Sequence, residues 1–363
     1  MNPIQKYLKN LFAAERLLGN DAKLIGLTKA DAVLTTLVNE KKVPGISISV
    51  LQEGDVVLQK GYGYADFEEK IPVHPEKTLF RIASVSKPIA ATALAQMVAD
   101  GQIDLDASFY NYVPYYPKKA HDFTLRQLAC HTAGIRGYRG IEYGLNKPYS
   151  IKESISVFKD DDLLFKPGTS YFYTSYGWVL ISLAMQEVSG IPFEDYVHKK
   201  VLATLGMKST FDPKAVLNAD VLHRVTKFYS KNRKGFRTAI PVNNFFKLAG
   251  GGYLSTAADI AKLGQAYLEG KILTHDVLSQ FLTSKTIKGV PTYYGLGWQV
   301  SQDKKGRRFY GHVGNGVGGY SNFFVYPEQQ MVLVILVNCT SPNIQVELDE
   351  VIDALIVSRT EES

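Results

Sequence analysis

Cysteine is almost absent from this 363-residue sequence, which contains only Cys130 and Cys339. Two cysteines this far apart exclude a disulfide framework and a metal site built on paired cysteines. No cluster of histidine and cysteine has the spacing of metal ligands either. We expect two buried free thiols, and the redox compartment stays open.

Long hydrophobic runs are also absent. The longest, Met331–Val337 (MVLVILV), fits a buried strand, and no run is long enough to cross a membrane. Residues 1–25 carry apolar side chains at helical spacing between charges, which predicts an amphipathic N-terminal extension and not a secretory signal. This extension is either an interaction arm or, as we favour, a helix packed on its own domain. The compartment is unknown; if an export signal has been removed, an extracytoplasmic location is favoured over a cytoplasmic one.

Strong charge of one sign is missing as well. The net charge of +6 is modest for this length, and hydrophobic residues at 45% indicate a globular chain. The one basic run, residues 231–237 (KNRKGFR), lies beside a glycine and is typical of a solvated turn. We therefore expect no nucleic-acid partner.

Strand-like segments occur at both ends of the chain, and helical segments fill the middle. Residues 26–42 predict a helix with Thr28 as its N-cap, and β-rich runs on both sides of residues 53–55 predict a hairpin. Four β-rich runs near the end precede a last amphipathic helix at 344–357. The simplest arrangement is an α+β fold, with an antiparallel sheet built from both termini, flanked by helices and holding an inserted, mostly helical region.

This arrangement predicts a main unit of residues 26–363 behind the extension 1–25. Residues 26–100 and about 246–363 form its α/β part, and residues from about 101 to 245 form its helical part. A cleft between the two parts is expected to hold the functional site.

One predicted helix start combines a serine with a lysine. Residues 79–101 (LFRIASVSKPIAATALAQMVADG) place Ser84 three positions before Lys87, and therefore on the same helix face. A serine hydroxyl is a poor nucleophile until a base takes its proton, and a lysine can be that base when burial or positive charge lowers its pKa. Ser84 is preferred to Ser86 because only Ser84 lies one turn before Lys87. The plainer alternative is a surface helix that carries a lysine.

The spacing of Ser84 and Lys87 is weak evidence by itself, because Ser156–Lys159 and Ser301–Lys304 repeat it in exposed-looking or charged segments.

A second candidate is Tyr173, which follows a Pro-Gly turn and precedes a helix. A lysine ammonium nearby would hold it as a phenolate base, whereas the default for a tyrosine is packing. A third candidate is His312, on a strand that runs into several glycines. Such a segment accommodates a ligand and offers amide N–H groups to an oxyanion; the alternative is a glycine-rich hairpin with an incidental histidine.

The order of these motifs resembles the serine β-lactamase and penicillin-binding-protein superfamily, and most of all its class C β-lactamase-related hydrolases. The stretches that carry the resemblance span about residues 26–357 and include FRIASVSKPI, TLRQLACHTAGI, FKPGTSYFYTSYGWVLI, LAGGGYLSTAADIAKLG, YGLGW and YGHVGNGVGGYS. Three more, YVPYYPKK, GIRGY and WVLISLAMQEVSG, look most like the group of the animal mitochondrial β-lactamase-like protein and its bacterial relatives.

The resemblance implies a β-lactamase/transpeptidase-like fold and a role for each motif. Ser84 would be the acylated nucleophile, Lys87 its activator and Tyr173 a second general base. The implied substrate-binding residues are Ser175, His312, Gly314 and Asn315. His312 would replace the lysine of the third motif, and the backbone N–H groups of Ser84 and Asn315 would form the oxyanion hole. The resemblance requires neither a metal nor an organic cofactor, and it assigns His131 a structural role.

Two departures from the family pattern narrow the expected activity. Ser175 stands where an asparagine is usual, and Val313 stands where a threonine often meets a substrate carboxylate. The loss of such polar partners disfavours β-lactams and D-Ala-D-Ala ends. We expect a serine hydrolase of peptide amides or small esters. The alternatives are a β-lactamase or penicillin-binding D-Ala-D-Ala carboxypeptidase, and a non-catalytic assembly protein.

Other expectations concern partners and the pocket. The partner is a small-molecule or peptide substrate, and a homo-oligomer is possible at the level of the family. The width of the pocket depends on residues 136–148 and 225–247, which carry no motif.

Overall fold

The computed structural model describes residues 24–357, so most of the predicted N-terminal extension lies outside the described residues. The chain divides into two compact units, Met1–Lys42 with Asn343–Ser363, and Val43–Pro342. In the first unit, helix α2 (Gly26–Asn39) packs on helix α11 (Gln345–Val357), and Lys29 pairs with Glu350 at 2.9 Å. Both helices were predicted. The N-cap was wrong, because α2 begins at Gly26 and Thr28 lies inside it.

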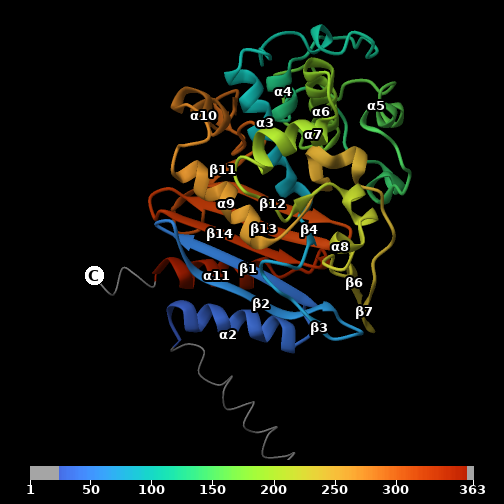
Figure 1. Ribbon diagram of the computed structural model, residues 1–363. Coiled ribbons are helices and arrows are strands. Elements are labelled where there is room, and N and C mark those ends of the chain that lie inside the picture. Colours follow the sequence, from blue (N-terminus) through green and yellow to red (C-terminus); the bar gives the residue numbers. More distant parts are fainter. Residues whose placement is uncertain (1–23, 358–363) are drawn as a thin grey trace, which may run out of the picture. The chain divides into compact units, whose positions relative to one another are not determined.

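The second unit is built on a seven-stranded antiparallel sheet in the order β11-β12-β13-β14-β1-β2-β3 (Figure 1). The strand bounds are β1 Gly45–Gln52, β2 Asp55–Asp66, β3 Ile71–Pro72, β11 Gln299–Gln302, β12 Arg308–Gly316, β13 Gly319–Tyr326 and β14 Met331–Val337. β14 pairs with β1 in the register Ile335 to Ile48, which joins the late strands to the early ones. Every residue of β14 is buried, as its unbroken apolar run predicts. The α+β fold with a sheet built from both ends of the sequence is therefore confirmed.

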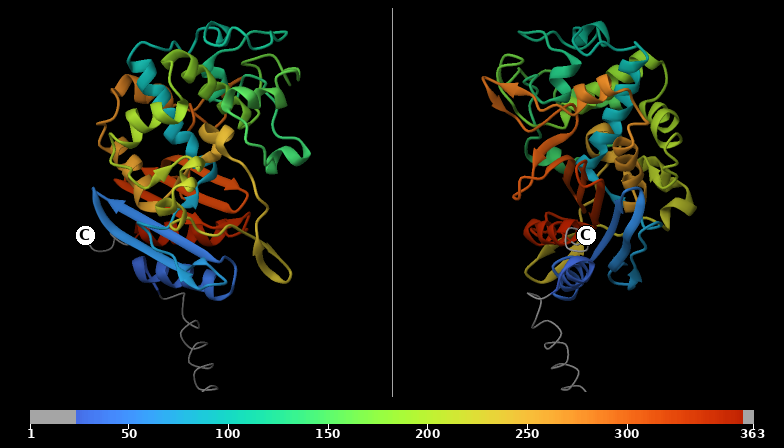
Figure 2. Two further views of the ribbon diagram at one scale, coloured as in Figure 1. Left: turned by 45° about the vertical axis from the view of Figure 1, so that its right-hand side comes forward. Right: turned by 90° about the vertical axis from the view of Figure 1, so that its left-hand side faces the viewer.

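Helices cover this sheet and form the region inserted between its strands (Figures 1 and 2). Their bounds are α3 Ser86–Ala99, α4 Leu125–Ala129, α5 Ile151–Ser154, α6 Tyr176–Ser189, α7 Phe193–Val197, α8 Ala219–Leu222, α9 Ala257–Leu268 and α10 His275–Phe281. α9 packs on β1, β13 and β14, and Gly264 permits the close approach, since an added Cβ would lie 2.5 Å from Val332 Cγ1. α3 runs through the centre of the helical region, and its residues from Ser86 to Ala95 are all buried. Its small side chains suit this central position.

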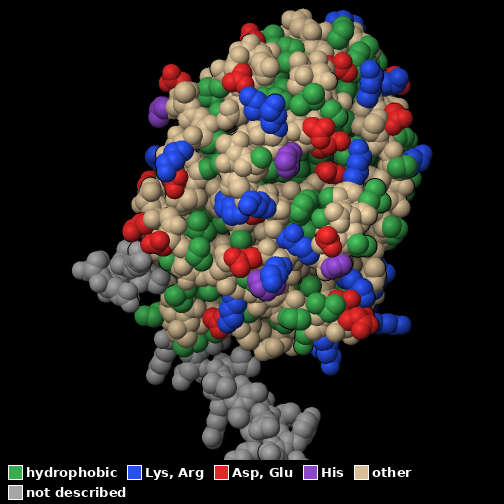
Figure 3. Space-filling view, in the orientation of Figure 1, with side chains coloured by type: hydrophobic (Ala, Val, Ile, Leu, Met, Phe, Trp, Pro, Cys, Tyr) green, Lys and Arg blue, Asp and Glu red, His purple; other side chains and the backbone are tan. Residues whose placement is uncertain are grey.

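Three small sheets hold the connecting segments. They are β4 (Phe80–Arg81) with β8 (Leu254–Ser255) and β5 (Thr210–Phe211); β15 (Cys339–Thr340) with β6 (Tyr229–Asn232) and β7 (Gly235–Thr238); and β9 (Thr286–Ile287) with β10 (Val290–Pro291). The basic run therefore forms the β6–β7 hairpin, with exposed side chains at its turn. On the face shown in Figure 3, Lys and Arg side chains are scattered among Asp and Glu side chains.

Several smaller expectations are settled by the second unit. Cys130 and Cys339 are both free and buried. Within residues 24–357, no helix is long and apolar enough to cross a membrane. The boundaries predicted near residues 101 and 245 stay a prediction.

Candidate active site

Ser84 lies in a single 3-10 turn, Ala83–Val85, that leads directly into α3. The Lys87 Nζ lies 3.0 Å from the Ser84 Oγ, so the predicted pair is formed. Ser86 is excluded from the pair, because its buried hydroxyl accepts the backbone N–H of Tyr253 at 3.1 Å. The repeat at Ser156 is structural, since this exposed hydroxyl donates to the Glu153 carbonyl.

The Lys87 amine is completely buried, and it has no carboxylate partner in the part of the chain that the structure describes. Its Nζ donates to the Gly250 carbonyl at 2.6 Å and lies 3.3 Å from the Ser175 Oγ. Burial without a counter-charge lowers the pKa of Lys87 well below its ordinary value of 10.5. This lowered pKa favours the neutral amine, which is the form that a base for Ser84 requires.

Tyr173 completes the cluster from the loop before α6. Its hydroxyl donates to the Ser84 Oγ at 2.8 Å, and the Lys87 Nζ lies 4.8 Å from its ring centroid. Although 38% of the residue is exposed, burial of its hydroxyl raises the pKa of Tyr173 above its ordinary value of 10. A resting phenolate, the form considered for a tyrosine beside a lysine, is therefore not favoured, because burial of the hydroxyl disfavours its charged form.

The ring of His131 packs against the ring of Tyr173. Its ring lies 4.4 Å from the Tyr173 ring between centroids, and its Nδ1 accepts the backbone N–H of Thr174 at 3.3 Å. The residue is 2% exposed, and burial lowers its pKa well below 6.5. These contacts are the ones expected of a structural histidine.

His312 lies on β12 beside the same cluster. It stands where the third motif of the family pattern has a lysine, but it does not supply the positive charge of that lysine. Its Nδ1 lies 2.7 Å from the Val313 carbonyl, which only accepts, so we assign the ring hydrogen to Nδ1. The Nε2 then accepts the Tyr294 hydroxyl at 2.8 Å. Burial, followed by the charge of Lys87, lowers the pKa of His312 to about 3. His312 is therefore neutral near pH 7, and the third motif carries no cation.

Gly314 passes close to the nucleophile. A Cβ added there would lie 2.2 Å from the Ser321 Oγ, 2.5 Å from the Ile82 carbonyl oxygen and 3.1 Å from the Ser84 backbone nitrogen. Asn315 reaches the cavity next to Ser84, but its side chain is held by Ser341, to which its Nδ2 donates at 2.9 Å. Binding of substrate by the Asn315 side chain is thus not favoured, whereas its backbone role stays a prediction.

The packing around β12 predicts that alanine destabilises the protein more at one of its glycines than at another. Gly314→Ala is expected to lower the free energy of unfolding by about 1–3 kcal/mol, because the methyl group has no space. Gly316→Ala is the matched control, since its nearest neighbour would be the Ala83 Cβ at 3.2 Å. Denaturant unfolding of both variants measures the difference, and equal stabilities would contradict it.

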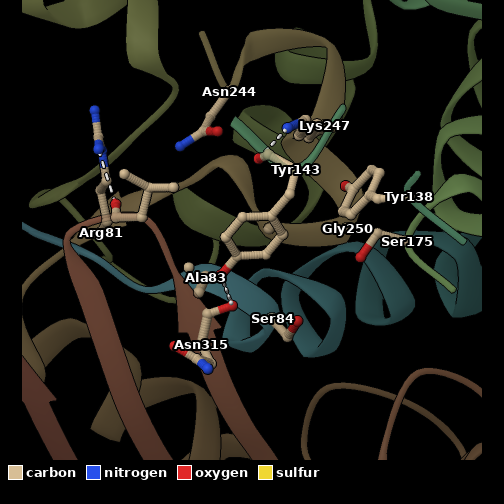
Figure 4. A pocket seen from close by; sticks show the side chains of 13 residues that line it. Arg81, Ala83, Ser84, Tyr138, Tyr143, Ser175, Asn244, Lys247, Gly250 and Asn315 are labelled. Atoms are coloured by element: carbon tan, nitrogen blue, oxygen red, sulfur yellow. Dashed lines mark hydrogen bonds between the residues drawn. The ribbon is translucent and has the colours of Figure 1, made fainter. Parts of the chain in front are cut away.

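A cavity of about 50 Å³ lies beside Ser84 and has room for only a few water-sized groups (Figure 4). Ser84 and Ser175 line it, together with Tyr138 and Tyr143 from the segment 136–148. Asn244 and Lys247 line it from the segment 225–247, so the prediction that these two segments bound the pocket is confirmed.

Three residues near the site were missed by the sequence analysis: Arg81, Lys247 and Tyr294. Arg81 and Lys247 line the cavity, and Tyr294 bonds to His312. Each lies within or beside a stretch that resembles the family, but none belongs to a motif with assigned chemistry. Only the fold brings them to the cluster.

Comparisons with known proteins show the family and the fold of the chain. The human mitochondrial serine beta-lactamase-like protein LACTB is 28% identical, over 82% of this chain and 71% of its own. The structure of the octameric penicillin-binding protein homologue from Pyrococcus abyssi superposes with a TM-score of 0.77 at 27% identity, covering 89% of this chain and 76% of that one. The D-amino acid amidase from Ochrobactrum anthropi SV3 shares the fold, with a TM-score of 0.81, 23% identity and coverage of 91% and 99%. The model of the Beta-lactamase family matches residues 30–357, and the chain belongs to this family of serine hydrolases.

Proposed function

We propose that this protein hydrolyses small esters or peptide amides through an acyl-enzyme on Ser84. One observation carries the proposal: the Ser84 Oγ lies 3.0 Å from the amine of Lys87 and 2.8 Å from the hydroxyl of Tyr173, beside a cavity. A nucleophile within hydrogen-bonding distance of a base and of a proton donor is what acyl transfer requires.

In acylation, the Ser84 Oγ attacks the substrate carbonyl and its proton passes to the neutral Lys87 amine. The carbonyl oxygen becomes negative, and the backbone N–H groups of Ser84 and Asn315 are the proposed donors to it. The bond to the leaving group then breaks, and the leaving group takes the Tyr173 proton. The result is an acyl-enzyme with a Lys87 ammonium beside a Tyr173 phenolate. The short approach of Nζ to the tyrosine ring, 4.8 Å, supports the mutual stabilisation of these charges.

Deacylation restores the starting protons. A water molecule attacks the acyl carbon and gives its proton to the Tyr173 phenolate. The Ser84 Oγ then leaves and recovers its proton from the Lys87 ammonium. In this cycle the phenolate exists only after acylation, which reconciles a general-base role for Tyr173 with its raised resting pKa.

Small acyl groups are favoured over β-lactams by three features of the pocket. Ser175 and Val313 lack the amide and hydroxyl groups that the family pattern usually places there. His312 carries no charge near pH 7, and the cavity is small. A panel of p-nitrophenyl acetate, D- and L-amino-acid amides and nitrocefin tests the choice. Rapid turnover of nitrocefin alone would favour the β-lactamase alternative, and turnover of none of them would favour the assembly protein.

The role of Tyr173 predicts a dependence on the leaving group. Tyr173→Phe removes the proton donor of acylation, so kcat/KM, which reports acylation, is expected to fall about 10²–10³-fold for an amide or alkyl ester and much less for a p-nitrophenyl ester, whose leaving group needs no proton. Tyr171→Phe is the matched control, because the Tyr171 hydroxyl forms no hydrogen bond to residues 24–357. Equal losses on both kinds of substrate would count against proton donation.

The remaining expectations stay proposals. The description of the Pyrococcus abyssi homologue as octameric supports a homo-oligomer. Relatives include a mitochondrial protein and Penicillin-binding protein 4* of Bacillus subtilis, and an extracytoplasmic location is kept as the favoured compartment.

A further inference from the structure

Two cations line the Ser84 cavity without a carboxylate partner among residues 24–357. Arg81 enters from β4, and Lys247 from the segment before Leu248. The Glu142 carboxylate acts on the pKa of Lys247, but it is already paired with Arg136 at 2.6 Å. The positive charge of these two side chains is thus left unbalanced within the pocket.

Arg81 is held in place by contacts that leave most of its donors unused. One terminal nitrogen donates to the Val317 carbonyl at 2.8 Å, and the guanidinium lies 3.8 Å from the centroid of the Phe228 ring. An arginine has five N–H donors, so its planar group can still bind a carboxylate with two parallel hydrogen bonds. Burial lowers the pKa of Arg81 to about 10, which leaves it charged at neutral pH.

Lys247 is only 5% exposed and is similarly fixed. Its Nζ donates to the carbonyls of Glu142 and Tyr143 at 3.2 and 3.1 Å, and one of its three N–H donors is left over. Burial, followed by the nearby charge of Arg81, lowers the pKa of Lys247 to about 8. The two cations therefore repel each other, and an anion between them would relieve this cost.

Asn244 adds a neutral donor at the same place. Figure 4 shows it between Arg81 and Lys247, and its side-chain amide forms no hydrogen bond within the described part of the chain. Its N–H groups are available to a ligand that also contacts the two cations. The donors are separate from the third motif, whose histidine is neutral.

We propose that Arg81, Asn244 and Lys247 form a subsite for a carboxylate of the substrate, next to the carbonyl that Ser84 attacks. The preferred substrates are then esters or amides with a free carboxylate on the acyl part, such as hemi-esters of short dicarboxylic acids. The expected preference in turnover rests on the proposed hydrolysis. Binding of the carboxylate to the subsite does not require hydrolysis.

The test compares two esters that differ in the carboxylate: mono-p-nitrophenyl glutarate and p-nitrophenyl pentanoate. The native enzyme is expected to show a kcat/KM about tenfold or more higher for the glutarate ester, as charged hydrogen bonds allow. Lys247→Met should bring this ratio close to one. Lys214→Met is the matched control, because Lys214 is exposed and pairs with Glu194 at 3.3 Å, and it should keep the ratio of the native enzyme. A ratio near one in the native enzyme would overturn the subsite.

A second measurement separates the subsite from hydrolysis. In the Ser84→Ala protein, free glutarate should raise the unfolding temperature more than uncharged pentanamide does, and Arg81→Gln should remove the difference. Loss of Arg81 also removes its contact with Phe228, so Lys247→Met is measured in parallel in case the first variant does not fold. Equal shifts with glutarate and pentanamide overturn the subsite even if both esters are hydrolysed. A larger shift with glutarate but no hydrolysis of either ester would keep the subsite and reject the proposed function.

Discussion

Replacement of Ser84 by alanine is expected to lower kcat/KM for p-nitrophenyl acetate by about 10⁴-fold or more. In the proposed cycle the Ser84 oxygen is the atom that becomes acylated, and neither Lys87 nor Tyr173 can take its place, because Lys87 takes the Ser84 proton and Tyr173 supplies a proton to the leaving group. The fold should not suffer, since Ser84 is partly exposed at the cavity and its hydroxyl bonds to nothing but these two partners in the described structure.

The matched control is Ser156→Ala, which alters the look-alike Ser156–Lys159 pair. Its hydroxyl only donates to the Glu153 carbonyl on an exposed turn, so the rate should stay within a factor of about two. The initial rate of p-nitrophenol release measures both variants. A Ser84→Ala protein with most of the native rate would show that hydrolysis proceeds without this nucleophile.

The second large effect is expected from Lys87→Met. Methionine fills much of the same buried space but cannot accept the Ser84 proton, so kcat/KM should fall about 10²–10⁴-fold. Lys159→Met, at the end of the look-alike pair, should leave the rate unchanged. A rate close to that of the native protein in Lys87→Met would assign activation of Ser84 to another group.

The pH dependence of the unfolding free energy gives an independent test of the Lys87→Met variant. The folded-state pKa of Lys87 is lowered below 10.5, so the unfolded chain binds a proton that the folded one does not. The native protein should therefore gain stability from this group as pH rises from the folded-state pKa towards 10.5. Lys87→Met should lack this gain, so the difference in unfolding free energy between the two proteins should change between neutral and alkaline pH.

The cluster itself could be predicted because its members are local to recognisable elements. Ser84 and Lys87 lie on one helical turn, which spacing alone reveals, and Tyr173 lies at a loop-to-helix junction. Likewise, the unbroken apolar run of β14 and the strands at both ends of the chain were enough to predict the sheet.

The charges of the site could not be predicted, because they depend on burial. A phenolate was considered for Tyr173 and His312 was compared with a lysine, yet burial of their polar atoms favours the neutral form of both. The approach of Arg81 to Lys247 also depends on tertiary structure, since 165 positions of chain separate them and neither lies in a motif with assigned chemistry. Sequence spacing shows which side chains share a helix face, but it does not show how far the fold excludes water from them.

The central claim is that Ser84 forms a covalent bond with the acyl group or its mimic. Treatment with a fluorophosphonate, followed by intact-mass measurement and peptide mapping, tests it directly. One adduct per chain is expected, located in the peptide that contains Ser84 and absent from Ser84→Ala, while Ser156→Ala is labelled like the native protein. An adduct on another residue, or equal labelling of Ser84→Ala, would contradict it.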